Sequence, residues 1–530
     1  MDIVLDFDLD PGTPAYRRLA ESIRRGVLEG RFRPGEKLPP TRALASSLKL
    51  ARNTVLEAYE QLIAEGYLVA RHGSGTYVAP DLPERSLRAP VTPRRPQELP
   101  PPVEAPLSAF GKRVVNGEVP VRMRREEGDS PYEFRYGTPS LDEFPMDAWR
   151  TLTKRVLDYP PRELLGYGPT EGLPQLREAL ARYLQRSRGV RCSAEDVFIV
   201  NGSQQALDMS ARVLLNDGDG VAIEEPCYPG ARTVFEANGG RILPVPVDEE
   251  GIVVSAIPPG AKLAYVTPSH QFPTGAVMSA TRRLELLQWA DANDAIIIED
   301  DYDSEFRYEG RPLAALQGLD ERGRVLYTGT LSKVLLPALR LGYMVAPRGL
   351  QLALAGTKWL TDRHVALLYQ AVLALFIEEG HFERHLRRMR KVYERRRAAM
   401  LEAFDRYFGD RAIVTGTESG MHVLVQIRDV ADADEYIARA REQGVGIYSA
   451  RSYYSTEPPP GAIFLMGYTS VPRSRFTRGF GCSRRLRRTR RFRRRRSRPR
   501  ATRAAACHPT PGARARLPVR GREWSRRRGY

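Results

Sequence analysis

The sequence predicts a multi-domain chain in which a small helical module precedes a large α/β domain with a mostly parallel sheet. Residues 14–79 hold three helical patterns and a glycine-tipped hairpin pattern. A proline-rich stretch follows. Beyond it, short β-branched runs such as VFIV (197–200), KLAYV (262–266) and AIIIE (295–299) alternate with helical segments, which is typical of parallel strands joined by helices.

Composition divides the 530 residues into four segments: a helical module at 1–79, a linker at 80–120, the α/β domain at 121–472 and a tail at 473–530. Nine prolines between 80 and 106 exclude a helix or a central strand there and favour a semi-rigid linker. The tail holds 23 Arg, no Lys and one acid, Glu523. Subtracting it from 82 basic and 64 acidic residues leaves 59 and 63, so the body of the protein is slightly acidic.

The arginine-rich tail has no apolar periodicity and is predicted to be disordered. Two interpretations of it stay open. Arginine without lysine is what a GC-rich gene yields when it is read out of frame, which favours a frameshift product. A native basic tail that adds non-specific affinity for DNA is the alternative.

Composition also indicates the cellular setting. The longest apolar run, VALLYQAVLALFI (365–377), has thirteen residues, fewer than the roughly eighteen that a membrane span needs, so we expect a buried helix. The N-terminus, MDIVLDFDLDPG, lacks the features of a secretory signal. The four cysteines show no paired spacing, which predicts neither disulfides nor a metal site. We therefore expect a cytoplasmic protein.

The N-terminal module is predicted to be a winged helix-turn-helix. Thr41 is expected to cap a short helix, and RNTVLEAYEQLIAEG (52–66) to form the next one. A hairpin with its tip at HGSG (72–75) follows. The side chains expected to face the module's core from the second of these helices are Val55, Leu56, Tyr59, Leu62 and Ile63.

This geometry reads DNA by placing the start of the second helix in the major groove. Arg52, Asn53 and Thr54 lie at that start, where arginine can pair with guanine and asparagine with adenine. Arg42 and His72 would approach phosphates or the neighbouring minor groove. A helical dimerisation module with incidental arginines is the alternative.

In LPPTRALA (38–45) and HGSGTYV (72–78) the module resembles the winged-helix domain of GntR-type bacterial regulators. The resemblance implies that Arg42, Arg52, His72 and Gly73 contact DNA.

In the large domain, TGTLSKVLLPALRLGY (328–343) sets Lys333 among apolar neighbours. An ammonium there must be paired, lose its proton or enter a covalent bond. A desolvated lysine is nucleophilic and forms a Schiff base with an aldehyde. Ser332 and Arg340 would complete a phosphate site beside it. A structural salt bridge is the alternative, but it does not explain these neighbours.

Two further motifs point to the same ligand chemistry. NGSQQALDM (201–209) opens a helix after a strand, so the amides of Gly202, Ser203 and Gln204 are suited to an anion, although such a sequence is often only a helix cap. DDYDSEF (300–306) places Asp300 and Tyr302 beyond the carboxyl end of AIIIE, where open sheets bind ligands. A carboxylate there can keep a pyridine nitrogen protonated, and a phenol can bond a ring oxygen, whereas an N-cap carboxylate is the alternative.

Together with YGPTEGLPQLREALARYL (167–184), EEPCYPGA (224–231) and TPSHQFPTG (267–275), these motifs resemble a fold-type I, aspartate aminotransferase-like domain over residues 132–468. The resemblance implies pyridoxal 5′-phosphate held as a Schiff base on Lys333. It further implies that Asp300 lies at the pyridine nitrogen, Tyr302 near O3′, Tyr228 against the ring and Arg340 at the phosphate.

The fusion of a winged helix, a proline-rich linker and this domain resembles the MocR/GabR-type subfamily of GntR regulators. That resemblance implies a cytoplasmic homodimer, paired head to tail with exchanged domains. It also implies a double-stranded DNA operator as partner and the sensing of pyridoxal phosphate together with an amine or amino-acid effector.

Two departures from aminotransferase enzymes favour a regulator. Phe272 stands where the enzymes carry asparagine before PTG, and AIFLMGY (462–468) lacks the arginine that would hold a substrate carboxylate. An active pyridoxal phosphate-dependent aminotransferase with a fused DNA-binding module stays an alternative, as does a cofactor-free dimerisation platform.

Overall fold

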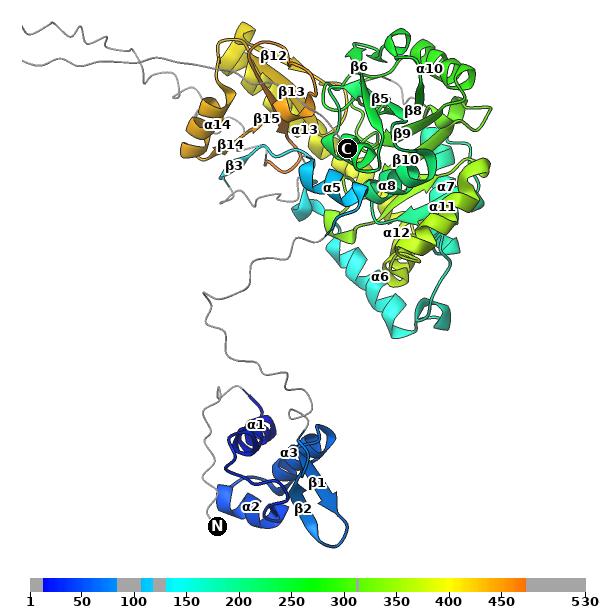
Figure 1. The fold of residues 1–530 in the computed structure, drawn as a ribbon. Helices are drawn as coiled ribbons and strands as arrows, with labels where there is room; N and C mark the ends of the chain where they lie inside the picture. The colour runs from blue at the N-terminus through cyan, green and yellow to red at the C-terminus, as the bar shows by residue number, and fades with distance from the viewer. Residues whose placement is uncertain (1–12, 83–105, 118–129, 311–313, 473–530) are drawn as a thin grey trace, which may run out of the picture. The chain divides into compact units, whose positions relative to one another are not determined.

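The computed structural model describes residues 13–82, 106–117, 130–310 and 314–472 (Figure 1). The predictions for the arginine-rich tail and for most of the proline-rich segment lie outside the described residues. The chain divides into two compact units, Met1–Pro106 and Leu107–Tyr530. Each unit is described by itself below.

The first unit is a three-helix module with a hairpin, as the sequence predicted. Its elements are α1 (Ala15–Leu28), α2 (Thr41–Leu48), α3 (Arg52–Ala64), β1 (Leu68–Arg71) and β2 (Gly75–Val78). The two strands pair antiparallel, with Leu68 opposite Val78 and Arg71 opposite Gly75. Leu19, Val55 and Leu62 are completely buried and join the helices around one core.

Two details of this module differ from the sequence-based prediction. Helix α2 begins at Thr41, whose side chain forms no cap bond, and Pro40 is the N-cap residue with a φ of −54°. Proline suits the start of a helix because its φ is already fixed near the helical value. Leu56 is 41% exposed, since the buried face of α3 follows Val55, Ala58, Tyr59 and Leu62. One residue further along a helix turns the side chain by about 100°.

The second unit is built on an eight-stranded sheet with the order β4-β11-β10-β9-β8-β5-β6-β7. Strands β5, β6, β8, β9 and β10 run parallel to their neighbours within this group, while β11 and β7 are antiparallel. The prediction of a mostly parallel sheet is therefore confirmed. The strands are β4 (Val197–Val200), β5 (Gly220–Glu225), β6 (Arg241–Asp248), β7 (Gly251–Ile252), β8 (Ala261–Val266), β9 (Ile296–Asp301), β10 (Val325–Thr330) and β11 (Gly342–Val345).

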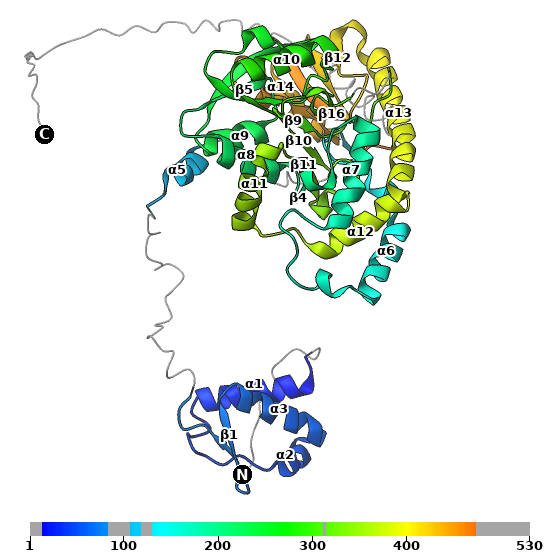
Figure 2. The same ribbon diagram turned by 90° about the vertical axis from the view of Figure 1, so that its right-hand side faces the viewer.

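Helices cover both faces of this sheet, as Figures 1 and 2 show. Because successive residues of a strand point to opposite faces, Ile199 and Phe198 enter different cores. On the Ile199 side lie α6 (Met146–Asp158), α7 (Pro174–Arg188), α12 (Leu367–Glu378) and α13 (His381–Phe408). On the Phe198 side lie α8 (Ser203–Leu214), α9 (Pro229–Ala237) and α11 (Arg348–Thr361), while α10 (Ala280–Ala292) borders a smaller cluster.

Helix α12 confirms the interpretation of its all-apolar sequence, because it is buried between α6, α7 and α13. Within the described parts of the chain, no helix combines the length and apolar character needed to cross a membrane.

A second, four-stranded sheet forms one wall of the candidate site. Its order is β12 (Ala412–Thr415), β13 (His422–Ile427), β16 (Ala462–Gly467) and β15 (Tyr448–Ser449). Val423 and Phe464 face the core shared with α13 and α14 (Ala433–Glu442). On the opposite face Leu424 and Leu465 pack against Phe272. A short parallel pair, β3 (Tyr132–Glu133) and β14 (Val445–Gly446), forms a separate two-stranded sheet.

Helix α5 (Ala109–Asn116) falls within the segment that the sequence assigned to the linker. Ser108 caps the helix by accepting a hydrogen bond of 3.1 Å from the backbone of Gly111. Arg113 donates to the carbonyl of Ala237 at 2.9 Å and pairs with Asp217 at 3.2 Å. These contacts attach residues 107–117 to the second unit, so the unit begins earlier than the predicted boundary at 121.

Candidate functional site

Lys333 lies just beyond β10 and is partly buried. Its Nζ donates to the carbonyl of Gly137 at 3.1 Å and lies 4.9 Å from the centre of the Tyr136 ring. Desolvation lowers the pKa of Lys333, Asp303 and Asp300 oppose that shift, and Arg340 adds to it. The neutral, nucleophilic form of the amine is therefore favoured relative to a solvent-exposed lysine.

Ion pairs do not explain this lysine. The lysines that form ion pairs within the described residues are Lys262, with Asp219, and Lys358, with Asp362. The structural salt-bridge interpretation of Lys333 is therefore not supported by the contacts.

Gly137 shapes the space around the amine. Its φ is +81°, and a Cβ on this residue would lie 2.4 Å from Lys333 Nζ. The backbone conformation therefore favours glycine, and a Cβ here would displace the lysine amine. This residue was not recognised in the sequence, because it lies 196 positions before the lysine.

Asp300 is buried near the carboxyl end of β9, with 4% of its surface exposed. The strand continues to Asp301, so Asp300 lies within the strand and not beyond it as the sequence suggested. Its Oδ2 accepts a hydrogen bond of 2.8 Å from Tyr265, and burial raises the pKa of Asp300 to about 7. Oδ1 is buried and has no hydrogen-bond partner among the described residues. This orphaned acceptor fits a protonated ring nitrogen.

An anion site lies at the start of α8. Gly202, the N-cap residue, has a φ of +81°, and a Cβ there would lie 3.2 Å from Nη2 of Arg340. The Arg340 side chain, which stays exposed, donates from Nη2 to the carbonyl of Asn201 at 2.8 Å. Ser332 Oγ is buried without a partner in the described parts of the chain. The structure thus brings the guanidinium of Arg340 to the start of α8, and a guanidinium at a helix N-terminus suits a phosphate. We expect the Ser332 hydroxyl to add a further donor.

Tyr228 and Gln204 form a second part of this pocket. The Tyr228 hydroxyl donates to Gln204 Oε1 at 3.3 Å, and Gln204 Nε2 donates to the carbonyl of Gly230 at 3.0 Å. The Tyr228 ring meets Phe272 edge-on, with centroids 5.9 Å apart. Gln204 therefore orients the ring predicted to lie against the cofactor, a role for its side chain that the sequence did not indicate.

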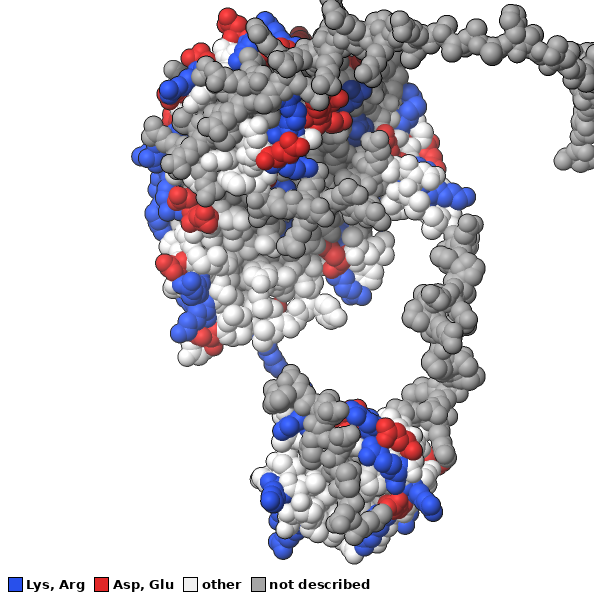
Figure 3. All heavy atoms as spheres, turned by 90° about the vertical axis from the view of Figure 1, so that its left-hand side faces the viewer, with Lys and Arg blue, Asp and Glu red and all other residues white. Residues whose placement is uncertain are grey.

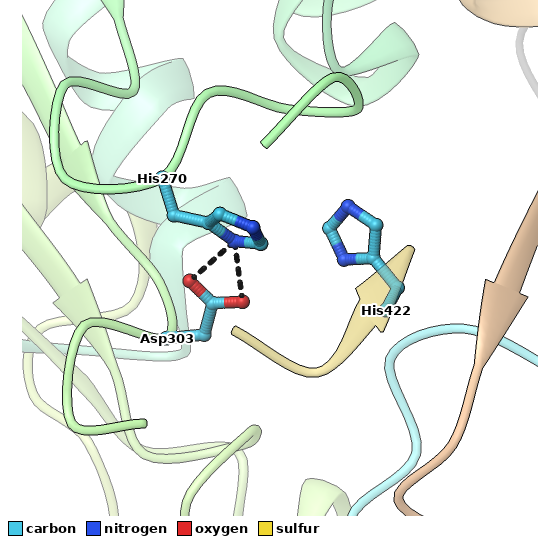
Figure 4. Close-up of side chains that lie close together, drawn as sticks. All are labelled: His270, Asp303 and His422. Atoms are coloured by element: carbon cyan, nitrogen blue, oxygen red, sulfur yellow. Dashed lines mark hydrogen bonds and ion pairs between the residues drawn. The ribbon is translucent and has the colours of Figure 1, made fainter. Parts of the chain in front are cut away.

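Tyr302 takes part in a buried polar cluster. Its hydroxyl donates to the carbonyl of His270 at 3.0 Å and lies 3.0 Å from Nδ1 of the same residue. Nδ1 also lies 3.0 and 3.2 Å from the two carboxylate oxygens of Asp303, and Figure 4 shows the His422 ring facing this pair. The phenol that was expected near a ring oxygen is thus engaged with His270 in this structure.

One ligating atom from each of His270, Asp303 and His422 lies within 4.8 Å of the others, a spacing compatible with a metal ion. The His270–Asp303 hydrogen bonds already use both carboxylate oxygens, and the lysine amine is close enough to affect the pKa of Asp303 and of His422. We therefore interpret the cluster as a hydrogen-bonded pair with a neighbouring imidazole. Gly420 makes room for it, because a Cβ there would lie 2.0 Å from Cε1 of His270.

Strand register explains why Tyr265 reaches Asp300. Tyr265 of β8 pairs with Ile298 of β9, and Asp300 lies two residues further along the same face. The sequence shows both runs but not that they are neighbours. An aromatic residue with a hydroxyl in the run KLAYV was the available signal.

In the first unit the predicted DNA-contacting residues lie at the surface. Arg52 and Asn53 are exposed at the start of α3, followed by the half-buried Thr54. Arg42 is exposed on α2. Figure 3 shows basic side chains on the face of the module that it presents.

The hairpin tip carries His72 and Gly73, both of which are exposed. The φ of Gly73 is +71°, a conformation that favours glycine, so this residue fixes the shape of the wing. The structure therefore presents the two expected reading elements, the start of α3 and the wing.

Comparison with known families agrees with both units. Residues 15–78 match the family described as "Bacterial regulatory proteins, gntR family", and residues 134–462 match "Aminotransferase class I and II". Fold and site together define a DNA-binding transcriptional regulator with an aminotransferase-like domain. More particularly, the chain belongs to the GntR-family regulators of the MocR type.

Two curated relatives match this chain over most of their own length. The chain is 39% identical over 473 residues to the probable rhizopine catabolism regulatory protein MocR of Rhizobium meliloti, covering 88% of this chain and 92% of that protein. It is 37% identical to the HTH-type transcriptional regulator YdeL of Bacillus subtilis, covering 90% and 98%.

A solved structure resembles the second unit. It is the α-aminoadipate aminotransferase LysN of Thermus thermophilus, complexed with N-(5′-phosphopyridoxyl)-L-leucine. The TM-score is 0.64 at 30% identity, and the match covers 71% of this chain and 96% of LysN.

Proposed function

We propose that this regulator binds an operator through α3 and the wing, and that its large domain holds pyridoxal phosphate at Lys333 and responds to an amine or amino acid. The observation that carries the proposal is the site itself. The amine of Lys333 bonds to a backbone carbonyl and forms no ion pair among the described residues, and the charges of Asp300 and Arg340 act on it. Asp300 keeps an orphaned carboxylate oxygen in the same part of the chain, and Arg340 bonds to the loop that opens α8. Since the operator is genomic DNA, we place the protein in the cytoplasm.

The cofactor, when bound, supplies an aldehyde carbon that condenses reversibly with primary amines. Asp300 would keep its ring nitrogen protonated through Oδ1, while Tyr265 holds the other carboxylate oxygen. Gly202, Ser332 and Arg340 would bind its phosphate. An effector amine would compete with the amine of Lys333, whose alternative partner is the carbonyl of Gly137. Effector binding would therefore change the position of the Lys333 side chain, which links the effector to the conformation of the site.

A homodimer is supported by an exposed apolar surface on the large domain. Leu352 and Leu360 of α11 are 87% and 79% exposed, and Tyr167 is 87% exposed. The guanidinium of Arg363 lies 4.5 Å from the ring of Trp359 and 5.7 Å from that of Tyr167, so these rings belong to one patch. A patch of this kind suits a second copy of the chain. We propose the head-to-tail arrangement with exchanged DNA-binding modules for this pair.

The test measures operator binding with and without the cofactor. An operator is selected from random DNA, and its affinity is then measured with cofactor-free protein, with added pyridoxal phosphate, and with a panel of amino acids and amines. We expect affinity to depend on the cofactor and on at least one amine, and Lys333→Ala to lose both dependences. An operator affinity that stays the same when pyridoxal phosphate or any of the amines is added would contradict the sensing role.

An aminotransferase with a fused DNA-binding module is the second candidate, favoured by the likeness to LysN. Phe272, which packs against Leu424 and Leu465, leaves no amide at that position for a ring oxygen. Sustained production of keto acids from added amino acids, at about one turnover per second or faster, would support the enzyme instead.

A further inference from the structure

A buried polar network joins the end of α11 to the start of α8. It lies next to the loop that carries the anion site. Lys358 of α11 is completely buried, and its partner Asp362, four residues later, is largely buried, with 21% of its side chain exposed. Asn201 and Gln205, from the loop and first turn of α8, complete the network. None of these four residues was singled out by its sequence context.

Three side chains donate to the single carboxylate of Asp362. Asn201 Nδ2 and Gln205 Nε2 donate to Oδ2 at 2.7 and 2.8 Å. Lys358 Nζ donates to Oδ1 at 2.8 Å and to Oδ2 at 3.2 Å. An ionised carboxylate accepts through both oxygens and can satisfy several donors at once. Asp362 is therefore the common anchor of the network.

The bonds to Asn201 fix the loop that carries the anion site. Its backbone N–H donates to Gln205 Oε1 at 2.7 Å, and its carbonyl accepts from Arg340 Nη2 at 2.8 Å. With the side-chain bond to Asp362, Asn201 is held through three different groups. The next residues, Gly202 and Ser203, provide the helix N-terminus. A shift at Asn201 would therefore misplace the amides that face the phosphate.

Lys358 is the cationic partner of the anchor. Desolvation lowers the pKa of Lys358, and its hydrogen bonds and charge interaction with Asp362 oppose this shift. A buried ammonium needs such a partner, and removing one member of the pair leaves the other uncompensated. The pair lies behind the loop, and Asp362 acts through Asn201 and Gln205.

We propose that Asp362 is a positioning residue for phosphate recognition, which it performs by bracing Asn201 and Gln205 behind the anion site. The inference rests on the proposed cofactor site. It predicts that Asp362 contributes to the preference of the protein for pyridoxal phosphate over pyridoxal, which lacks the phosphate, and not to the reactivity of Lys333.

The test compares the affinities of the full-length protein for pyridoxal phosphate and for pyridoxal, followed by absorbance. In Asp362→Ala we expect affinity for pyridoxal phosphate to fall by about 10- to 100-fold, the usual scale for losing a buried charged acceptor. Affinity for pyridoxal should match that of the wild type, because the ring pocket and Lys333 are untouched. A merely structural role would weaken both ligands equally.

Two paired variants separate positioning from the uncompensated charge. Lys358→Met with Asp362→Ala removes both charges, and should still lack the preference for the phosphate. Lys358→Met with Asp362→Asn keeps an acceptor oxygen for Asn201 and Gln205, and should recover most of it. The matched control is Asp410→Ala, an exposed aspartate after the end of α13, which should bind both ligands as the wild type does.

Equal losses for both ligands in the variant that combines Lys358→Met with Asp362→Ala, or no loss in Asp362→Ala, would overturn the inference. A wild-type protein that binds neither ligand covalently would instead overturn the cofactor assignment, and the inference with it.

Discussion

The two units of this chain use charged residues in opposite ways. In the DNA-binding module, Arg42, Arg52 and His72 are exposed. In the large domain, Asp300 and Arg188 are 4% and 7% exposed, respectively. An exposed recognition residue can therefore change with little cost to folding. A buried one serves the site and the stability of the fold together.

The largest expected effect is at Lys333. Lys333→Ala should abolish covalent capture of pyridoxal phosphate, because the amine that reacts with the aldehyde is gone. Borohydride reduction followed by peptide mass mapping measures this capture. The control variant is Lys262→Ala, which removes a surface lysine paired with Asp219. It should carry the reduced cofactor on Lys333, as the wild type does. A label that persists in Lys333→Ala at another lysine would refute the assignment.

Arg188 tests the structural side of the comparison. Its Nε pairs with Asp301 Oδ2 at 2.8 Å, and its Nη2 donates to Ser269 Oγ at 2.6 Å. Arg188→Met should lower the free energy of unfolding of the large domain by about 3–5 kcal/mol, because the Asp301 carboxylate is left buried without its ionic partner and keeps only the hydrogen bond from Tyr327 within the described residues. Urea unfolding followed by fluorescence measures the change.

Arg186, two positions earlier, is the control for that measurement. It is an exposed partner of Glu383, so Arg186→Ala should cost at most about 1 kcal/mol. If both variants lost the same stability, burial would not be the cause.

On the DNA-binding side, Arg52→Ala should weaken binding to the selected operator by about 1–3 kcal/mol, since arginine at the start of the reading helix pairs with a base. The absorbance of bound cofactor should be unaffected. Arg31→Ala, at an exposed arginine paired with Glu29, is the matched control. An equal loss on random DNA would mean that Arg52 touches only phosphate.

The smallest expected effect concerns pH. Burial raises the pKa of Asp300 to about 7, so the folded, cofactor-free protein keeps a proton that the unfolded chain has released above the ordinary value of 3.8. Stability from this group is therefore lost as pH rises towards 7. Between about pH 6 and pH 7 the free energy of unfolding should fall by about 1 kcal/mol because of Asp300. The variant Asp300→Asn should not show this part of the fall. Identical pH slopes in the two proteins would contradict the shifted pKa.

The sequence alone predicted the features that depend on local pattern. The mostly parallel sheet, the winged module, and the position of Arg340 beside Gly202 follow from motifs at strand and helix ends. Leu56 was misassigned because hydrophobicity alone does not say which apolar residue faces the core.

Residues brought in from distant segments could not be found in this way. Lys358 and Asp362, four residues apart on a helix, have the spacing of an ordinary surface ion pair. Only the tertiary structure shows that Lys358 is completely buried and that Asp362 reaches Asn201, 161 positions away. His270 and Asp303 are likewise joined across 33 positions.

The docking of α5 has a mechanical consequence. Helices α8 and α9 begin at the cofactor pocket, next to Gly202 and Tyr228, and their other ends carry the contacts to α5 through Asp217 and the carbonyl of Ala237. A short helix behaves as a stiff rod, so a tilt at one end is delivered to the other. A displacement at the candidate cofactor site could therefore be transmitted through α8 and α9 to α5, the first helix of the second unit.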